Sequence, residues 1–274
     1  MTVPLLPIAP ETSIRLAGSP LLVMLDVDGT LAPLAPRPQD AVVPAETRRI
    51  ISGLVARPNV HVVLVSGRGA ADARRLVAVA NTWVVGNHGF EIVSPDGREI
   101  IDPGLESLPP VIAEAHARLR PLVGDIPGVI LEQKRWALSV HYRLADPAAV
   151  PSLRSTVEET ARALGLRTQD GKMLIEVRPE ALVDKGSAVV ALIAPLGGAT
   201  DDASVLFAGD DVTDEDAFRA LREWSTRPVT IRVGEEEAAS SAEFGVCDTD
   251  EIRAFLEWLL ATRAPEARKK TGTS

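Results

Sequence analysis

The sequence is poor in features that would each point to a particular class of protein. It has one cysteine, Cys247, so an intrachain disulfide framework is excluded, which fits a reducing compartment. Basic residues do not predominate: 29 Lys and Arg face 38 Asp and Glu, and this formal net charge of −9 argues against binding nucleic acid or an anionic membrane. Apolar runs are short, as in residues 21–25, so no segment is predicted to span a bilayer. With 4% aromatic residues, the core must be built from aliphatic side chains.

What is present is a globular composition, with 46% hydrophobic and 24% charged residues in 274, a length suited to one large or two medium domains. The N-terminus has no basic segment ahead of an apolar one and carries prolines where an export signal would be apolar. We therefore expect a cytoplasmic protein, and we expect a monomer.

Short apolar runs that end in polar residues predict parallel strands. They are rich in β-branched residues and do not alternate, as is typical of strands buried on both faces. These strand patterns lie at 21–27, 60–67, 82–89 and 204–211. Helical patterns at 45–56 and 69–80 alternate with them, which implies a parallel sheet with right-handed crossovers. Since ligands bind beyond the carboxyl ends of such strands, the polar residues there should share one active site.

The middle of the chain follows a different pattern. It combines two helices with a strand pair and a hairpin that turns at Asp170-Gly171: helices 108–124 and 150–165, strand pair 129–143, hairpin 166–179. A separate α+β module inside an α/β core is therefore predicted. The expected division is a core of 20–106 and 182–263, an inserted module of 107–181, an extended lead-in of 1–19 and a flexible tail of 264–274.

Asp26 and Asp28 follow the first predicted strand and precede Gly29-Thr30. Alternate strand residues point to opposite faces, and the turn that Gly29 permits brings Asp28 back beside Asp26. Two such carboxylates can divide the work of nucleophile and general acid–base. The alternative is a turn or a helix cap. The apolar residue before the first Asp and the Gly-Thr after the second favour the catalytic hypothesis.

A second acidic cluster occupies residues 209–216. The helix dipole favours acids in the first turn of a helix, which accounts for Glu215 and Asp216. It does not account for Asp210 and Asp211, which end a buried strand and would repel the first acid pair without a cation. Ligands made of oxygen alone suit Mg²⁺, and no His/Cys cluster has zinc spacing.

Two further polar residues stand where they would contact a phosphoryl group. Lys185 begins a predicted helix just before the last strand, and Ser66 ends the second strand. Ser66 can donate a hydrogen bond to a phosphoryl oxygen, assisted by the amides of Gly67 and Arg68 near a helix start. The alternatives are a surface lysine and a simple helix N-cap.

These elements, in this order, resemble the haloacid dehalogenase-like phosphatase superfamily. The resemblance implies a Rossmann-like parallel-sheet core with a C2B-type α+β cap. It implies that Asp26 becomes an aspartyl-phosphate, while Asp28 protonates the leaving group and then activates water. Ser66 and Lys185 would bind the phosphoryl group. The resemblance also implies a Mg²⁺ site with these residues: Asp26, Asp28 through its backbone carbonyl, and Asp210, with Asp211 and Asp214 either supporting these ligands or adding to them.

Further motifs are similar to the trehalose-6-phosphate phosphatase family over roughly 20–262. They are SGR (66–68), GNHG (86–89), Glu132-x-Lys134 with HYR (141–143), EVRP (176–179), DKG (184–186) and GDDVTDED (209–216). In that family the inserted module is a lid whose polar residues hold the sugar. The resemblance therefore implies these substrate-binding residues: Gly67, Arg68, Asn87, His88, Glu132, Lys134, Arg143, Glu176 and Arg178.

Some of these residues have plainer interpretations. Glu132 and Lys134 lie on one face of a strand and would also suit a solvated cross-strand ion pair. His88 would also suit a core histidine hydrogen-bonded in a loop, and Arg178 a partner for a lid carboxylate.

The resemblance implies a Mg²⁺-dependent phosphatase of trehalose biosynthesis that converts a small sugar phosphate, trehalose 6-phosphate, into trehalose and phosphate. The alternatives are a phosphatase of sucrose phosphate or a hexose phosphate, a phosphomutase that retains its phosphoenzyme, and a non-catalytic sugar-phosphate sensor.

Overall fold

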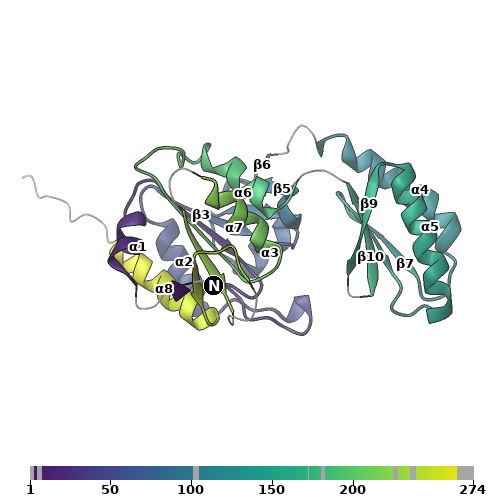
Figure 1. Cartoon of the computed structure of the whole chain (residues 1–274), viewed down its shortest axis with the longest axis horizontal. Helices are drawn as coiled ribbons and strands as arrows, with labels where there is room; N and C mark the ends of the chain where they lie inside the picture. The colour runs from purple at the N-terminus through teal and green to yellow at the C-terminus, as the bar shows by residue number, and fades with distance from the viewer. Residues whose placement is uncertain are drawn as a thin grey trace, which may run out of the picture. The chain divides into compact units, whose positions relative to one another are not determined.

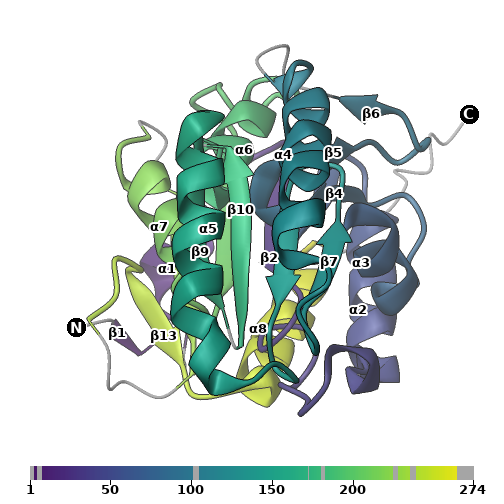
Figure 2. The same ribbon diagram turned by 90° about the vertical axis from the view of Figure 1, so that its right-hand side faces the viewer.

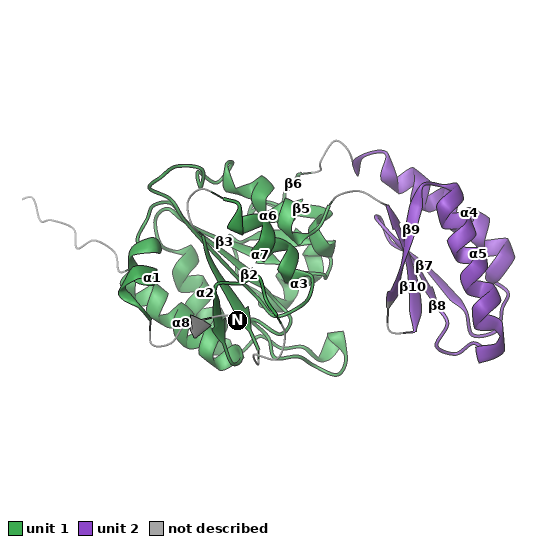
Figure 3. Ribbon diagram, viewed as in Figure 1, with its two compact units in different colours: residues 1–100, 183–274 green, residues 101–182 purple. Residues whose placement is uncertain are grey.

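The structure is a computed structural model that describes residues 3–4, 8–100, 105–171, 173–179, 183–224, 228–234 and 239–263 (Figures 1 and 2). The chain divides into two compact units (Figure 3). Unit 1 is Met1–Ile100 with Val183–Ser274, and unit 2 is Ile101–Leu182. The predicted tail, 264–274, lies outside the described residues.

Unit 1 is built on one large sheet. Within the described residues this sheet has nine strands, in the order β1-β13-β12-β11-β2-β3-β4-β5-β6. Neighbours are parallel from β1 to β4, which confirms the predicted parallel core, and β5 and β6 add an antiparallel edge. The strands are β1 Val3–Pro4, β2 Leu21–Asp26, β3 Val60–Val65, β4 Trp83–Gly86, β5 Glu91–Val93, β6 Glu99–Ile100, β11 Ser204–Gly209, β12 Val229–Val233 and β13 Phe244–Val246.

Helices cover both faces of this sheet. One apolar cluster joins it to α2, α3 and α8, and a second joins it to α6 and α7. Strand β2 shows why its sequence is continuously apolar: Leu21, Val23 and Leu25 enter the first cluster, whereas Leu22 and Met24 enter the second. The helices of unit 1 are α1 Pro10–Arg15, α2 Ala45–Val55, α3 Ala70–Val77, α6 Lys185–Ile193, α7 Asp214–Arg222 and α8 Thr249–Thr262, with 3₁₀ turns η1 Pro38–Asp40 and η2 Asn87–Gly89.

The lead-in is not simply extended, as the sequence suggested. Helix α1 begins at Pro10, a residue that the first helical position tolerates. Arg15 at its end pairs with both carboxylate oxygens of Glu243 at 2.8 and 2.7 Å and donates to the carbonyl of Pro228 at 2.7 Å. These distant contacts, together with the burial of Leu16, stabilise a helix that local sequence did not predict.

Unit 2 has its own sheet and its own apolar core. Its antiparallel strands lie in the order β7-β8-β10-β9, and α4 and α5 pack together on one face (Figure 2). The predicted hairpin is present, but Asp170 and Gly171 belong to β9 rather than to the turn, and Arg154 holds the Asp170 carboxylate at 2.7 Å. The elements are α4 Leu108–Val123, β7 Ile130–Gln133, β8 Leu138–His141, η4 Pro147–Ala149, α5 Val150–Ala163, β9 Leu166–Gly171 and β10 Leu174–Pro179.

Among the helices that the structure describes, none combines the length and the apolar character needed to cross a bilayer.

Candidate active site

Parallel pairing brings the polar ends of three strands to one edge of the sheet. Strand β2 lies between β11 and β3, and Asp26 is in register with Val65, the residue before Ser66. Asp210 directly follows β11. The carboxyl ends of β2, β3 and β11 therefore place Asp26, Ser66 and Asp210 in one neighbourhood.

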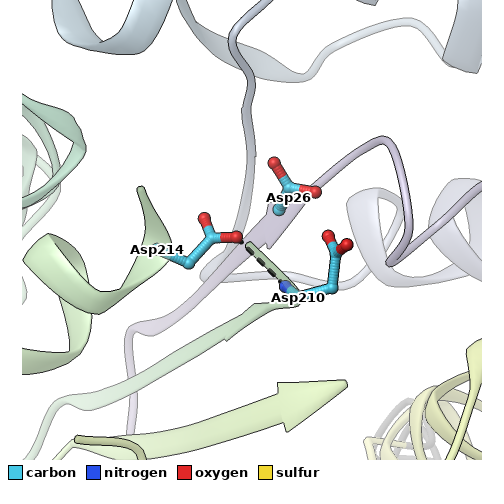
Figure 4. Close-up of side chains that lie close together, drawn as sticks. All are labelled: Asp26, Asp210 and Asp214. Carbon is cyan, nitrogen blue, oxygen red and sulfur yellow. Dashed lines mark hydrogen bonds between the residues drawn. The ribbon is translucent and has the colours of Figure 1, made fainter. Parts of the chain in front are cut away.

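Three carboxylates converge at this edge (Figure 4). Asp26, Asp210 and Asp214 each offer an oxygen within 4.8 Å of the others, and Asp26 and Asp214 are buried. Asp214 comes from the start of α7, and its Oδ2 accepts hydrogen bonds from the backbone N–H groups of Asp210 and Asp211 at 3.0 and 2.9 Å. Asp214 thereby fixes the loop that follows β11.

Gly29 lets the loop after β2 approach this cluster closely. Its φ is +87°, and a Cβ at this position would lie 2.0 Å from Asp210 Oδ2. Any other residue there would push Asp210 away and strain the backbone. The neighbouring Thr30 hydroxyl donates to Asp210 Oδ1 at 3.4 Å.

Lys185 supplies the positive charge of the cluster. It is 2% exposed, and its Nζ donates to Asp26 Oδ1 and Asp214 Oδ1, both at 2.7 Å. Helix α6 starts at this residue because Asp184 and Ser187 form a capping box around its N-terminus. Burial alone would lower the pKa of Lys185, but the carboxylates of Asp26 and Asp214 outweigh it and raise that pKa.

Burial of like charges perturbs the acids. Burial, reinforced by the charge of Asp214, raises the pKa of Asp26 well above its usual range, although Lys185 opposes the shift. The same two causes raise the pKa of Asp210 to about 6. When ionised, three carboxylates around one lysine carry two uncompensated negative charges.

This arrangement fits a divalent cation with oxygen ligands. Asp26 Oδ2 is buried and has no hydrogen-bond partner among the described residues, so one carboxylate oxygen faces the cluster unsatisfied. Such an oxygen is costly to bury unless a ligand completes it. The donor set, all oxygen and doubly negative, matches the preferences of Mg²⁺.

Asp28 lies apart from the three-carboxylate cluster. Its carboxylate accepts two hydrogen bonds from one guanidinium, from Arg68 Nε at 2.6 Å and from Arg68 Nη2 at 2.7 Å. These bonds raise the pKa of Arg68. The structure therefore separates the two acids of the Asp-x-Asp motif, one among the carboxylates and one on an arginine.

The loop after β3 places small polar groups beside these acids. The Ser66 hydroxyl oxygen accepts a hydrogen bond from the Arg68 backbone N–H at 3.1 Å, which leaves the hydroxyl hydrogen free to donate. His88 lies directly over Gly67, since a Cβ on Gly67 would lie 2.5 Å from His88 Cε1. A cavity of about 320 Å³ is lined by Asp26, Asp28, Leu34, Ala35, Pro38, Ala41, Gly67, Arg68, His88, Lys185, Asp211 and Thr213.

Two expected residues of unit 1 have other contacts. Asn87 donates its side-chain amide to Glu91 Oε1 at 2.7 Å, and the other oxygen of Glu91 accepts from the Ala70 backbone N–H at 2.7 Å. Asp211 is exposed and its carboxylate accepts from the N–H of Val212 at 2.7 Å, so it stands outside the cluster that includes Asp214.

Sequence reasoning missed Glu91 and Asp72 as parts of this region. Asp72 accepts from Arg68 Nη1 at 3.0 Å. Arg68 precedes α3, which begins at Ala70, so the helical spacing rule did not point to this contact. Glu91 belongs to no sequence motif. Its place in this region follows from the antiparallel pairing of β5 with β4, which the sequence did not predict.

Glu132, Glu176 and Arg178, three of the expected sugar-binding residues, lie on the sheet face of unit 2 opposite its apolar core. Glu132, Ser139 and Glu176 are in register across β7, β8 and β10. His141 Nε2 lies 2.8 Å from Glu132 Oε2, and Lys134 Nζ lies 3.8 Å from Glu176 Oε1. Arg178 on β10 is half-buried, and the remaining candidate, Arg143 after β8, is exposed.

The fold is that of the haloacid dehalogenase-like proteins. A haloacid dehalogenase-like hydrolase from Bacteroides thetaiotaomicron, 14% identical, matches 87% of this chain and 98% of its own, with a TM-score of 0.61. A crystal structure described as a trehalose-6-phosphate phosphatase related protein is 32% identical, with a TM-score of 0.68, and covers 88% of this chain and 97% of that one.

Sequence comparison shows to which family within this fold class the chain belongs. A model of the trehalose-phosphatase family matches residues 24–249, and the chain belongs to this family. A trehalose-phosphate phosphatase from Mycolicibacterium paratuberculosis is 36% identical over 248 residues, which is 89% of this chain and 63% of that protein. The chain spans between 16% and 63% of the length of the curated relatives it matches.

Proposed function

We propose that this protein is a Mg²⁺-dependent phosphatase that hydrolyses trehalose 6-phosphate to trehalose and phosphate. One observation carries the proposal: buried Asp26 has one oxygen held by Lys185 at 2.7 Å, while its other oxygen has no hydrogen-bond partner among the described residues. A carboxylate fixed on one side and unsatisfied on the other is poised as a nucleophile. The cavity beside it and the family of the chain favour a phosphate ester as substrate.

The metal would be held by Asp26 and Asp210, with Asp214 as a further partner. Mg²⁺ bound there supplies positive charge that neutralises the phosphoryl oxygens. The chain itself adds the ammonium of Lys185 and the hydroxyl of Ser66 as donors to the same group.

In the first step one carboxylate oxygen of Asp26 attacks phosphorus. A bond forms between that oxygen and phosphorus, and the bond from phosphorus to the sugar oxygen breaks. Asp28 acts as the general acid and gives a proton to the departing sugar oxygen, which leaves as the hydroxyl of trehalose. Asp26 then carries the phosphoryl group.

In the second step a water molecule attacks the same phosphorus. Asp28, now ionised, removes a proton from that water. The bond between phosphorus and Asp26 breaks, and phosphate leaves with the carboxylate of Asp26 restored. Asp28 thus takes part in both steps, whereas Asp26 forms and loses the covalent bond.

Unit 2 is the part of the chain that we assign to the sugar. The polar face of its sheet carries the carboxylates of Glu132 and Glu176, with the ammonium of Lys134 3.8 Å from Glu176 Oε1, and these groups suit the hydroxyl groups of a neutral disaccharide. In this proposal unit 2 is the cap, the ligand is a small sugar phosphate, and the reaction takes place in the cytoplasm.

Phosphate release from a panel of esters tests this function. With Mg²⁺ present, the purified protein should release phosphate from trehalose 6-phosphate with a kcat/KM well above that for sucrose 6-phosphate, glucose 6-phosphate or p-nitrophenyl phosphate, and excess chelator should abolish release. Asp26→Asn removes the nucleophile and should lower kcat by at least about 10³-fold.

Exposed Asp201→Asn, in the loop before β11, is the matched control and should behave like wild type. A preference for sucrose 6-phosphate or a hexose phosphate would refute the substrate assignment alone. Near-wild-type turnover by Asp26→Asn would remove Asp26 as the nucleophile.

A further inference from the structure

The sequence suggested that the backbone amide of Arg68 assists in binding the phosphoryl group, but the contacts of Arg68 indicate another role. Its guanidinium makes a two-pronged pair with Asp28, at 2.6 Å from Nε and 2.7 Å from Nη2. A bidentate pair between a guanidinium and a carboxylate fixes both the position and the orientation of the carboxylate. The pair spans 40 residues of sequence, from the loop after β2 to the loop after β3.

The rest of the guanidinium is anchored as well. Arg68 Nη1 donates to Asp72 Oδ2 at 3.0 Å, and Nη2 also donates to the Pro38 carbonyl at 2.6 Å. The side chain of Arg68 is 12% exposed. An arginine tied to a helix and to a separate loop is a rigid support, so it limits the motion of the carboxylate that it holds.

The number of Arg68 N–H groups that already have partners argues against a phosphate-binding role for this side chain. A guanidinium has five N–H groups. Four are engaged by Asp28, Asp72 and Pro38. The backbone N–H of Arg68 is engaged too, by the Ser66 hydroxyl at 3.1 Å. Among the described residues, one N–H of Arg68 has no partner, and a two-point contact with phosphate would require Arg68 to release at least one of Asp28, Asp72 and Pro38.

We propose that Arg68 is a positioning residue, which orients the Asp28 carboxylate for its two proton transfers, and is not a ligand of the phosphoryl group. The inference rests on the proposed function, because it takes from there the role of Asp28. It assigns the arginine of the Ser-Gly-Arg segment to the acid–base residue, while Ser66 of the same segment faces the phosphoryl group.

The leaving group decides whether phosphoryl transfer to Asp26 needs the proton of Asp28. Hydrolysis of the phosphorylated Asp26 needs Asp28 with either substrate. Trehalose needs a proton as it departs, so a misplaced Asp28 slows the first step. The p-nitrophenolate anion departs without a proton, so the first step is spared. The attack of water on the phosphorylated Asp26 still needs Asp28, and the phosphoenzyme should then accumulate.

Arg68→Gln tests this inference in rapid-quench kinetics with both substrates. For trehalose 6-phosphate, kcat should fall about 100-fold while KM changes by less than about threefold. For p-nitrophenyl phosphate, the fraction of protein phosphorylated on Asp26 after acid quench should rise at least about tenfold over wild type. Arg68→Lys keeps the charge without the fork and should restore part of kcat.

Arg75→Gln is the matched control, because Arg75 pairs with the same Asp72 from an exposed position and should leave both readouts unchanged. Thermal melting of each variant establishes that it is folded, and Arg68→Lys serves if Arg68→Gln is not. The inference is overturned if the Arg68 variants raise KM and the inhibition constant of inorganic phosphate with kcat unchanged, or if they match wild type. A wild-type protein that releases no phosphate refutes the proposed function instead.

Discussion

Asp26, Asp210 and Asp214 bring three carboxylates within 4.8 Å of one another around the ammonium of Lys185. Burying like charges together costs free energy, and the raised pKa values of Asp26 and Asp210 record that cost. The net charge of −9 is thus unevenly spread, because part of the acidic excess forms an oxygen-rich site. A site of this kind should repel phosphate until a cation and the surrounding donors reverse its sign.

This cost predicts how the metal-free protein responds to pH. The pKa of Asp210 is raised from 3.8 to about 6, so between these values the folded state holds a proton that the unfolded state has lost. The contribution of Asp210 to the stability of the metal-free protein therefore falls as pH rises from about 4 to about 6. Asp210→Asn should remove the loss of stability that Asp210 causes as pH rises. The variant should therefore have a higher melting temperature than wild type in the metal-free state at pH 7.5.

Differential scanning fluorimetry in chelator, from pH 4.5 to pH 7.5, measures both effects. Mg²⁺ should raise the melting temperature of wild type at pH 7.5 more than that of Asp210→Asn. Asp201→Asn serves as the surface control. An Asp210→Asn variant with a lower metal-free melting temperature at pH 7.5 would contradict the prediction.

At the scale of elements, the loop between β3 and α3 depends on a strand from elsewhere in the sheet. Glu91 on β5 accepts from the N–H of Ala70, the first residue of α3, at 2.7 Å and from the Asn87 amide at 2.7 Å. A carboxylate there satisfies an unpaired N–H at the helix start and interacts well with the helix dipole. The edge formed by β5 therefore supports the loop that carries Ser66 and Arg68.

Removing that carboxylate should destabilise unit 1. Glu91→Ala should lower the free energy of unfolding by about 1–2 kcal/mol, as is typical of a lost charged cap. Glu91→Gln keeps the shape without the charge and should lie between Ala and wild type. Urea denaturation followed by circular dichroism measures the change.

Glu223→Ala, at an exposed position just after α7, is the control for this series. Equal stability of Glu91→Ala and wild type would show that Glu91 does not support the helix start.

At the scale of the whole molecule, the two units have separate apolar cores and carry different chemistry. The carboxylate cluster, Lys185 and the Ser66 loop all belong to unit 1. Unit 2 has its own core beneath α4 and α5, and its polar sheet face holds Glu132 and Glu176. A division of this kind separates the bond-breaking groups from the residues that we assign to the sugar.

This division predicts a substrate-dependent effect of mutation. Glu132→Ala should lower kcat/KM for trehalose 6-phosphate about 100-fold, because sugar hydroxyls lose a buried partner in the complex. The same variant should change kcat/KM for p-nitrophenyl phosphate by less than about threefold, since that ester has no sugar. Steady-state kinetics on both substrates decides the matter. Exposed Glu114→Ala, on α4 of the same unit, should alter neither value.

A parallel loss on both substrates would show instead that Glu132 supports the structure of unit 2.

Hydrophobic periodicity determined the parallel core, because a strand buried on both faces must be apolar throughout and its polar residues must lie beyond its end. The sequence by itself therefore placed Asp26, Ser66 and Asp210 at neighbouring strand ends, and it separated an α+β insert from the core. Only the tertiary structure decided which partners these side chains meet. Arg68 holds Asp28, Asp214 rather than Asp211 joins the buried carboxylates, Glu91 supports α3, and the lead-in contains a helix. Such pairings depend on how loops and edges turn back on the sheet, and local sequence patterns do not encode that geometry.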